Sequence, residues 1–360
     1  MRNLSDTISR LAARRVKIAE PERDNGPLLS DLVNFGSNPG ALRARIYVPP
    51  KLPRSAPLVV VLHGCTQTAA GYNSGSGWSE LADREGFALL FPEQRRVNNP
   101  NLCFNWFEPG DMNRDSGEAL SIRQMIEKMV TANALDRSRI FITGLSAGGA
   151  MTSVMLATYP EVFAGGAIIA GLPYGTANSI PTAFDRMRGH GGPSEIRLQQ
   201  LLRAASSHKG PWPTISVWHG SSDQIVAGSN ADDIVRQWRT IHEINVEATP
   251  STTVVDGHSR RVWKDSTGRD AVEQYHITGM GHGTPLATGH KSLGATGPFM
   301  IDAGISSTQR IAHFWGIANS GIEILVPDQR EESKASVKPA TTHGIRRTIE
   351  DALKSAGLLP

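Results

Sequence analysis

The chain has 360 residues, of which 39% are hydrophobic and 20% are charged, as in an ordinary globular protein. Its 37 Lys and Arg residues nearly balance its 34 Asp and Glu residues, and no basic cluster has the density of a nucleic-acid-binding surface. No stretch approaches the roughly 18–20 apolar residues that span a bilayer as a helix. We therefore expect one large domain or two small ones, no nucleic-acid partner and no membrane span, with the oligomeric state left open.

Residues 1–40 are expected to form an arm at the periphery of the protein. Within this arm, residues 7–16 carry apolar side chains at helical spacing, which predicts a short amphipathic helix. Apolar residues alternate towards the end of residues 30–49, which is typical of antiparallel strands at a sheet edge. The N-terminus lacks the apolar run of a secretory signal, and this favours a cytoplasmic location.

Between residues 58 and 218, apolar strands alternate with amphipathic helices. The continuous apolar run at 58–62 predicts a strand that is buried on both faces. Further strands are predicted at 88–91, 139–143, 164–170 and 214–218, and helices at 78–85, 116–133 and 147–158. This alternation predicts an α/β fold with a mostly parallel central sheet and helices on both of its faces.

Two segments interrupt this alternation. Residues 172–212 form a long insertion rich in Gly, Pro and Arg, with a helix expected near 195–205, and such insertions commonly cap a binding site. Residues 260–277 predict a hairpin around a turn at 265–268. We expect residues 41–320 to form the main domain and the polar residues 321–360 to form a tail with a short helix.

The central chemical motif is G-x-S-x-G at residues 144–148. A predicted strand precedes it and a predicted helix follows it, so its serine, Ser146, would lie on the sharp turn between them. Such a turn crowds the backbone, and Gly144, Ala147 and Gly148 supply the small residues that it needs. These features predict an α/β-hydrolase fold with Ser146 as the nucleophile, although a serine in a purely structural turn is the alternative interpretation.

A serine hydroxyl is a weak nucleophile until a base lies against it and a third group orients that base. In this fold the chain order is serine, acid, histidine, and the acid follows a later strand. The predicted strand at 214–218 is followed closely by Asp223, which we expect to be the acid. Asp232 and Asp233 are its rivals, but both fall on the next helix, where a solvated face or a helix cap explains them.

The histidine should lie on a loop after a still later strand. The loop Gly279-Met280-Gly281-His282-Gly283 follows a predicted strand, and its glycines would let the imidazole of His282 reach the nucleophile. His290 is the main competitor. His219 and His276 lie within predicted strands, where packing or hydrogen bonding explains them.

Two backbone amides should hold the oxyanion of the tetrahedral intermediate. One is the amide of the residue after the nucleophile, Ala147, and the other belongs to the loop after an early strand. That loop contains His63-Gly64-Cys65, which places the amide of Cys65 in the expected position. No metal or cofactor is needed for this chemistry.

Several motifs, in chain order, resemble those of the poly(3-hydroxybutyrate) depolymerase family of esterases. They are LHGCTQT at 62–68, PEQ at 92–94, CFNWF at 103–107, GLSAG at 144–148 and HGSSD at 219–223. The resemblance extends from about residue 41 to residue 317. It implies a Ser–Asp–His triad, which falls on Ser146, Asp223 and His282.

The chain has two cysteines, Cys65 and Cys103, which by count alone are either free thiols or one disulfide. The resemblance implies that they form a disulfide, which would clamp the oxyanion loop to the segment that carries Trp106. Because disulfides persist in oxidising compartments, such a bond favours export and leaves the location open.

The resemblance also implies that Trp106 is a wall of the acyl or alcohol pocket, although a core tryptophan is the alternative. Gln67, Tyr174 and Tyr72 are weaker candidates for the pocket, each with a structural role as the alternative.

These features predict a serine carboxylic ester hydrolase that acts on short hydroxyalkanoate polyesters and small esters. The sequence shows no second domain large enough to bind a polymer surface after the catalytic region. We therefore expect soluble oligoesters, amorphous polyester (including polylactide-like chains) or short acyl and aryl esters as substrates, rather than crystalline polymer. The alternatives are a feruloyl or acetyl-xylan esterase, an acyltransferase with the same triad, and a binding module without catalysis.

Overall fold

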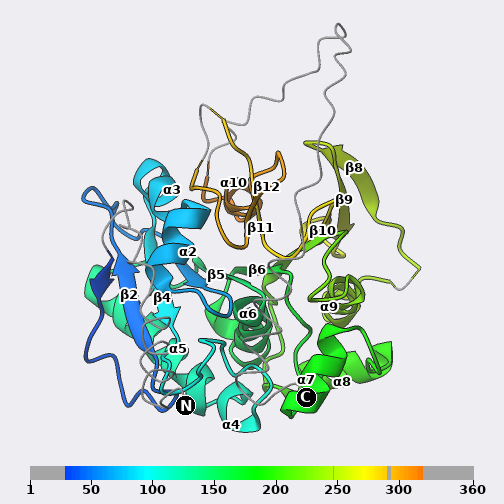
Figure 1. Cartoon of the computed structure of the whole chain (residues 1–360), viewed down its shortest axis with the longest axis horizontal. Coiled ribbons are helices and arrows are strands. Elements are labelled where there is room, and N and C mark those ends of the chain that lie inside the picture. The colour runs from blue at the N-terminus through cyan, green and yellow to red at the C-terminus, as the bar shows by residue number, and fades with distance from the viewer. Residues whose placement is uncertain (1–28, 246, 290–292, 319–360) are drawn as a thin grey trace, which may run out of the picture.

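A ten-stranded sheet runs through the middle of the computed structural model, which describes residues 29–245, 247–289 and 293–318 (Figure 1). Its strands lie in the order β1-β2-β4-β3-β5-β6-β7-β10-β9-β8. These strands are β1 (Ser30–Asp31), β2 (Arg43–Tyr47), β3 (Leu58–Leu62), β4 (Ala88–Glu93), β5 (Ile140–Leu145), β6 (Gly165–Ile169), β7 (Thr214–Gly220), β8 (Ser251–Val255), β9 (His258–Lys264) and β10 (Asp270–Ile277). A separate parallel pair consists of β11 (Thr284–Leu286) and β12 (Met300–Asp302).

The centre of the sheet, from β4 to β10, is parallel, and antiparallel strands flank it on both sides. On one side β2 pairs with β4 and β1 with β2, and on the other β9 pairs with β10 and β8 with β9. All five residues of β3 are buried, as its continuous apolar run predicts for a strand covered on both faces. The mostly parallel sheet and its antiparallel edge at β1–β2 confirm the predictions.

Helices cover both faces of the sheet and bury two separate apolar clusters against it (Figure 1). α5, α6 and α9 pack on one face, while α2, α3 and α10 pack on the other. The helices are α2 (Ala69–Ser76), α3 (Trp78–Glu85), α4 (Pro109–Met112), α5 (Gly117–Asn133), α6 (Ala147–Thr158), α7 (Ile180–Met187), α8 (Glu195–Ala204), α9 (Ser229–Arg239) and α10 (Ser307–Phe314), with a short 3₁₀ turn at Pro160–Val162.

The insertion at residues 172–212 contains two helices, of which α8 was predicted and α7 was not. The predicted hairpin is β9–β10, and it is extended outwards by β8. The helices predicted near residues 7–16 and in the C-terminal tail lie outside the described residues. Within the described part of the chain, no helix has the length and apolarity to span a membrane.

The topology brings the predicted catalytic residues to one edge of the sheet. Because parallel strands share their direction, the loops that follow β3, β5, β7 and β10 all leave at the same edge. These loops carry Cys65, Ser146, Asp223 and His282, in that order.

Candidate active site

Ser146 lies on a strained turn between β5 and α6. Its φ of 57° and ψ of −118° place a non-glycine residue in a region that L-residues avoid, as at a nucleophile elbow. The turn requires small neighbours, because a Cβ on Gly148 would lie 2.4 Å from the carbonyl oxygen of His63. The backbone N–H of Ser146 donates to the carbonyl oxygen of Ile169 (2.9 Å), which ties the elbow to the neighbouring strand β6.

His282 and Asp223 form a hydrogen-bonded pair at the same edge of the sheet. Nδ1 of His282 lies 2.7 Å from Oδ2 of Asp223, and both side chains are almost fully buried. The other carboxylate oxygen of Asp223 accepts from the backbone N–H groups of Ile225 (2.8 Å) and Val226 (2.9 Å). The imidazole is thereby fixed with Nδ1 as donor and Nε2 directed away from Asp223.

The environment keeps Asp223 ionised. Burial raises the pKa of this carboxyl, but the hydrogen bond and charge of His282 and the N–H of Val226 outweigh burial and hold it below its ordinary value. His219 lies next to Asp223, with Nε2 2.9 Å from the carbonyl oxygen of Val226 and 3.5 Å from Oδ2 of Asp223. Burial lowers the pKa of His219, which favours the neutral ring.

The rival residues occupy other positions. Asp232 lies on α9, where its carboxylate pairs with Arg261 and accepts from Gln274. Asp233 pairs with Arg236 on the same helix (2.7 Å). His276 is exposed on β10, and His290 lies outside the described residues.

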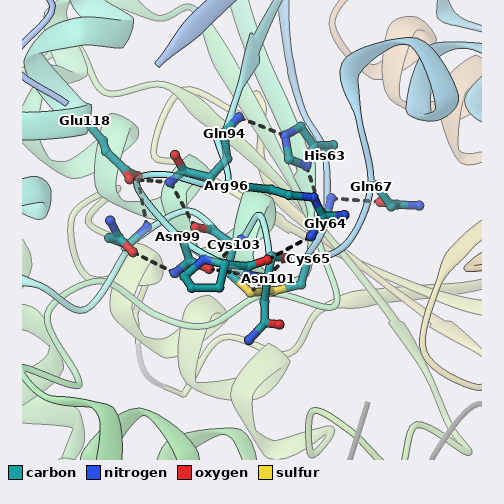
Figure 2. Close-up of a disulfide and its surroundings, with 12 residues drawn as sticks. His63, Gly64, Cys65, Gln67, Gln94, Arg96, Asn99, Asn101, Cys103 and Glu118 are labelled. Atoms are coloured by element: carbon teal, nitrogen blue, oxygen red, sulfur yellow. Dashed lines mark hydrogen bonds between the residues drawn. A yellow bond between two sulfur atoms is a disulfide. The ribbon is translucent and has the colours of Figure 1, made fainter. Parts of the chain in front are cut away.

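The loop after β3 is held on several sides. Its backbone N–H at Gly64 donates to Oε1 of Gln67 (2.8 Å), and its N–H at Thr66 donates to the carbonyl oxygen of Asn101 (2.7 Å). The disulfide between Cys65 and Cys103 joins the loop covalently to the segment that follows β4 (Figure 2). This bond is the one that the resemblance implied.

A cavity of about 160 Å³ opens beside Ser146 and is lined by both Ser146 and His282. Cys65 and Ala147, the predicted oxyanion donors, also line it. As the first residue of α6, Ala147 has a backbone N–H without an acceptor inside the helix. The cavity therefore brings nucleophile, base and two candidate backbone donors to one space.

Two different surfaces enclose this cavity. What we call the loop wall is formed by residues 64–67 and 99–107 and includes Gln67, Asn99, Asn101, Trp106 and Phe107. What we call the helix wall is apolar and consists of Leu172, Ile180, Ala183, Phe184, Met187, Ile225 and Val226.

The predicted pocket residues divide between the cavity and the core. Trp106 and Gln67 line the cavity, and Trp106 packs edge-on against Phe107. Tyr174 is buried and is not among the lining residues; its backbone N–H instead donates to Oε1 of Gln237 (3.0 Å). Tyr72 is fully buried, with its hydroxyl 3.1 Å from that of Thr284.

The residues of α7 and the asparagines Asn99 and Asn101 are lining residues that sequence reasoning did not single out. The position of the insertion was the available signal for α7, because the insertion was expected to cap the site. No motif distinguishes the two asparagines. Among the described residues, no group of three His, Cys, Asp or Glu side chains could hold a metal ion.

A parallel sheet with a strained serine between a strand and a helix defines the α/β-hydrolase class. The solved acetyl xylan esterase from Aspergillus awamori shares this fold, with a TM-score of 0.69 and 23% sequence identity over 81% of this chain and all of that one.

The chain belongs to the esterase PHB depolymerase family, whose model matches residues 42–260. It is 47% identical over 292 residues to the poly(3-hydroxyalkanoate) depolymerase C of Paucimonas lemoignei, a match that covers 80% of this chain and 70% of the relative. Acetylxylan esterase of Coprinopsis cinerea is 31% identical over 71% of this chain and 69% of its own length. Feruloyl esterase B of Talaromyces funiculosus is 29% identical over 71% and 73%, respectively. The protein is accordingly a carboxylic ester hydrolase.

Proposed function

We propose that the protein hydrolyses esters through an acyl-enzyme on Ser146, with His282 as general base and Asp223 as the group that orients it. The observation that carries this proposal is the single cavity shared by the strained Ser146 and by His282, whose Nδ1 lies 2.7 Å from Asp223. These are the parts that nucleophilic ester hydrolysis requires. The catalytic domain in this proposal comprises residues 41–320, with 172–212 as its cap.

The proposed reaction has two stages, acylation of Ser146 and hydrolysis of the acyl-enzyme. Nε2 of His282 takes the proton of the Ser146 hydroxyl as its oxygen attacks the ester carbonyl, and the imidazolium then protonates the leaving alcohol. The amides of Cys65 and Ala147 hold the negative oxygen of the tetrahedral intermediate. Water, deprotonated by the same histidine, attacks the acyl-enzyme and releases the acid.

The substrate class that we propose is short hydroxyalkanoate polyesters and their oligomers. The relative named as a poly(3-hydroxyalkanoate) depolymerase supports this class. A cavity of about 160 Å³ with an apolar helix wall also fits a short aliphatic acyl group. Feruloyl or acetyl-xylan ester hydrolysis is the second candidate, because relatives bearing those names match over 71% of this chain.

The mechanism is tested by replacing Ser146→Ala and measuring hydrolysis of p-nitrophenyl butyrate. We expect kcat to fall on the order of 10⁴-fold or more, because the acyl-enzyme can no longer form. The matched control is Ser153→Ala on the same helix, whose buried hydroxyl donates to the carbonyl oxygen of Gly149. Retained hydrolysis in the Ser146 variant would rule out the mechanism.

The substrate class is tested with a panel of amorphous poly(3-hydroxybutyrate), hydroxybutyrate oligomers, methyl ferulate and acetylated xylan. We expect the hydroxybutyrate oligomers to have the highest kcat/KM. A higher kcat/KM on the feruloyl or acetyl-xylan substrate would favour the second candidate. Adding an alcohol acceptor to the reaction detects acyl transfer as a new ester.

A further inference from the structure

Glu118 is a fully buried carboxylate that does not line the cavity and takes no part in the proposed proton transfers. It is the second residue of α5, behind the loop wall. A buried carboxylate is costly, and substitution by an apolar residue is often neutral or stabilising. Burial, followed by the charge of Asp111, raises the pKa of Glu118, and the hydrogen bonds that its two oxygens accept oppose this shift and favour the ionised form. Stability alone therefore does not account for a carboxylate at this position.

The groups that contact the side-chain oxygens of Glu118 are all hydrogen-bond donors. Oε1 accepts from the side-chain amides of Gln94 (2.6 Å) and Asn98 (3.4 Å), and Oε2 accepts from the backbone N–H of Asn105 (2.9 Å). Figure 2 shows Glu118 and Gln94 side by side, next to the segment that carries Cys103. The amide of Gln94 also donates to the carbonyl oxygen of Cys103 (2.9 Å). Glu118 thus forms hydrogen bonds with both ends of the segment 94–105, which precedes Trp106.

A second chain of bonds runs from Gln94 to the loop after β3 (Figure 2). The backbone N–H of Gln94 donates to Nε2 of His63 (3.2 Å). Because Nε2 must then be an acceptor, Nδ1 carries the hydrogen and donates to the carbonyl oxygen of Gly64 (2.8 Å). His63 is fully buried, and burial lowers its pKa, which is consistent with this neutral form.

The last acceptor in this series of hydrogen bonds, the carbonyl oxygen of Gly64, belongs to the peptide group that carries the Cys65 N–H. The carbonyl of Gly64 and the N–H of Cys65 belong to the same planar peptide group and point in opposite directions. A bond from His63 to that oxygen therefore sets the direction of the Cys65 N–H and polarises it. The Cys65 N–H is one of the two donors to the oxyanion in the proposed function.

We propose that Glu118 is a positioning residue for ester hydrolysis, which acts through Gln94 and His63 to aim the Cys65 N–H at the oxyanion. The inference rests on the proposed function, in which that N–H stabilises the transition state. Through Asn105 the same carboxylate holds the backbone next to Trp106, so one buried group sets the two parts of the loop wall relative to each other.

The test is Glu118→Gln, which keeps the shape of the side chain but places an amide N–H₂ opposite one of the three donors. We expect kcat for p-nitrophenyl butyrate to fall about tenfold, with KM changed less than threefold, because the oxyanion contact is made in the transition state. The Ki of an alkyl trifluoromethyl ketone, which forms an oxyanion on the nucleophile, should rise about tenfold as well.

The matched control is Glu273→Gln. Glu273 is also a buried carboxylate, but it lies on β10, where it pairs with Arg260 and Ser216 away from the cavity. We expect its kcat, KM and Ki to stay within twofold of the wild type, although its melting temperature falls. If Glu118→Gln behaves like this control, or changes KM without changing Ki, then Glu118 does not position the oxyanion donor.

Two further measurements keep the outcome unambiguous. Should Glu118→Gln fail to fold, Gln94→Met is the second variant, because it removes the side chain that links Glu118 to Cys103. We expect its kcat to fall and its Ki to rise, each by about threefold. Unchanged values in that variant overturn the proposal. The Ser146→Ala variant separates the proposed mechanism from the positioning role of Glu118. If Ser146→Ala is inactive and Glu118→Gln has normal kinetics, only the positioning role is rejected.

Discussion

The two walls of the cavity are built in opposite ways. The loop wall is cross-linked by the Cys65–Cys103 disulfide and by the bond from the Thr66 N–H to Asn101, and the Glu118 hydrogen bonds hold it from behind. The helix wall presents apolar side chains of α7. This helix is bonded to its neighbours at its C-terminal end, where Met187 accepts from the N–H of Ala227 (2.7 Å) and Arg186 accepts from Asn230 (2.9 Å).

This difference corresponds to two different tasks. An oxyanion donor must be placed to within a fraction of an ångström, and directional bonds achieve this because their energy depends on geometry. Contact with an aliphatic acyl chain is non-directional, and its strength follows the apolar area that is buried. We therefore expect changes in the loop wall to alter the rate on every ester, and changes in the helix wall to alter the choice among esters.

The largest effect is expected when the disulfide is removed in a Cys65→Ala/Cys103→Ala variant. The bond closes a loop with a sequence separation of 38 residues, so its loss should lower the free energy of unfolding by on the order of 3–4 kcal/mol. Because the loop wall is loosened, kcat/KM should fall about 10- to 100-fold for acetyl and butyryl esters alike. Chemical denaturation and steady-state kinetics measure the two effects.

The wild type treated with dithiothreitol is the matched comparison for this variant. A thiol titration under denaturing conditions should find no free thiol before treatment and two after it. Equal kcat/KM before and after reduction would show that the disulfide does not position the loop wall.

A smaller and selective effect is expected on the helix wall. Ala183 is buried and faces the cavity, so Ala183→Leu should fill space that a butyryl chain needs. We expect the ratio of kcat/KM for p-nitrophenyl butyrate to that for the acetate to fall about tenfold, since a misfitted methylene is worth roughly 1–3 kcal/mol. The kcat/KM for the acetate should stay within threefold.

The opposite change on the same helix is the control. Phe184 is half-buried and also lines the cavity, so Phe184→Ala should enlarge it and shift the ratio towards longer acyl chains. If both variants lower the acetate and butyrate rates by the same factor, α7 does not select the acyl group.

Local patterns in the sequence were sufficient for much of the fold. The apolar run of β3 and the glycines around Ser146 are patterns of a few neighbouring residues, and each is typical of one local structure. The sheet and the elbow were therefore predictable. The contacts of α7 with the cavity were not predictable from the sequence, because the side of a helix that meets a cavity depends on how the insertion folds back over the sheet. Glu118 gave no signal, since an acidic residue in the first turn of a helix is common and its three donors come from other segments. The roles of Ser146, Asp223 and His282 stay predictions until variants are measured.

The smallest expected effect on catalysis is at His242, which lies outside both walls and serves as a reference for them. Burial, and then the charge of Arg269, lower its pKa from 6.5 to about 4, while Nε2 donates to the carbonyl oxygen of Pro213 (3.0 Å). A histidine whose pKa is lower in the folded state favours folding above pH 6.5 and loses that contribution as the pH falls towards 4.

His242→Gln retains an N–H donor without this titration. Between pH 7 and pH 4.5, we expect the free energy of unfolding of the wild type to fall by on the order of 2 kcal/mol more than that of the variant. The comparison uses differences because His63 and His219, whose pKa values are also lowered, destabilise both proteins in acid. A difference that does not change with pH would show that His242 titrates normally, whereas a loss of kcat at pH 7 would show that the site extends beyond its two walls.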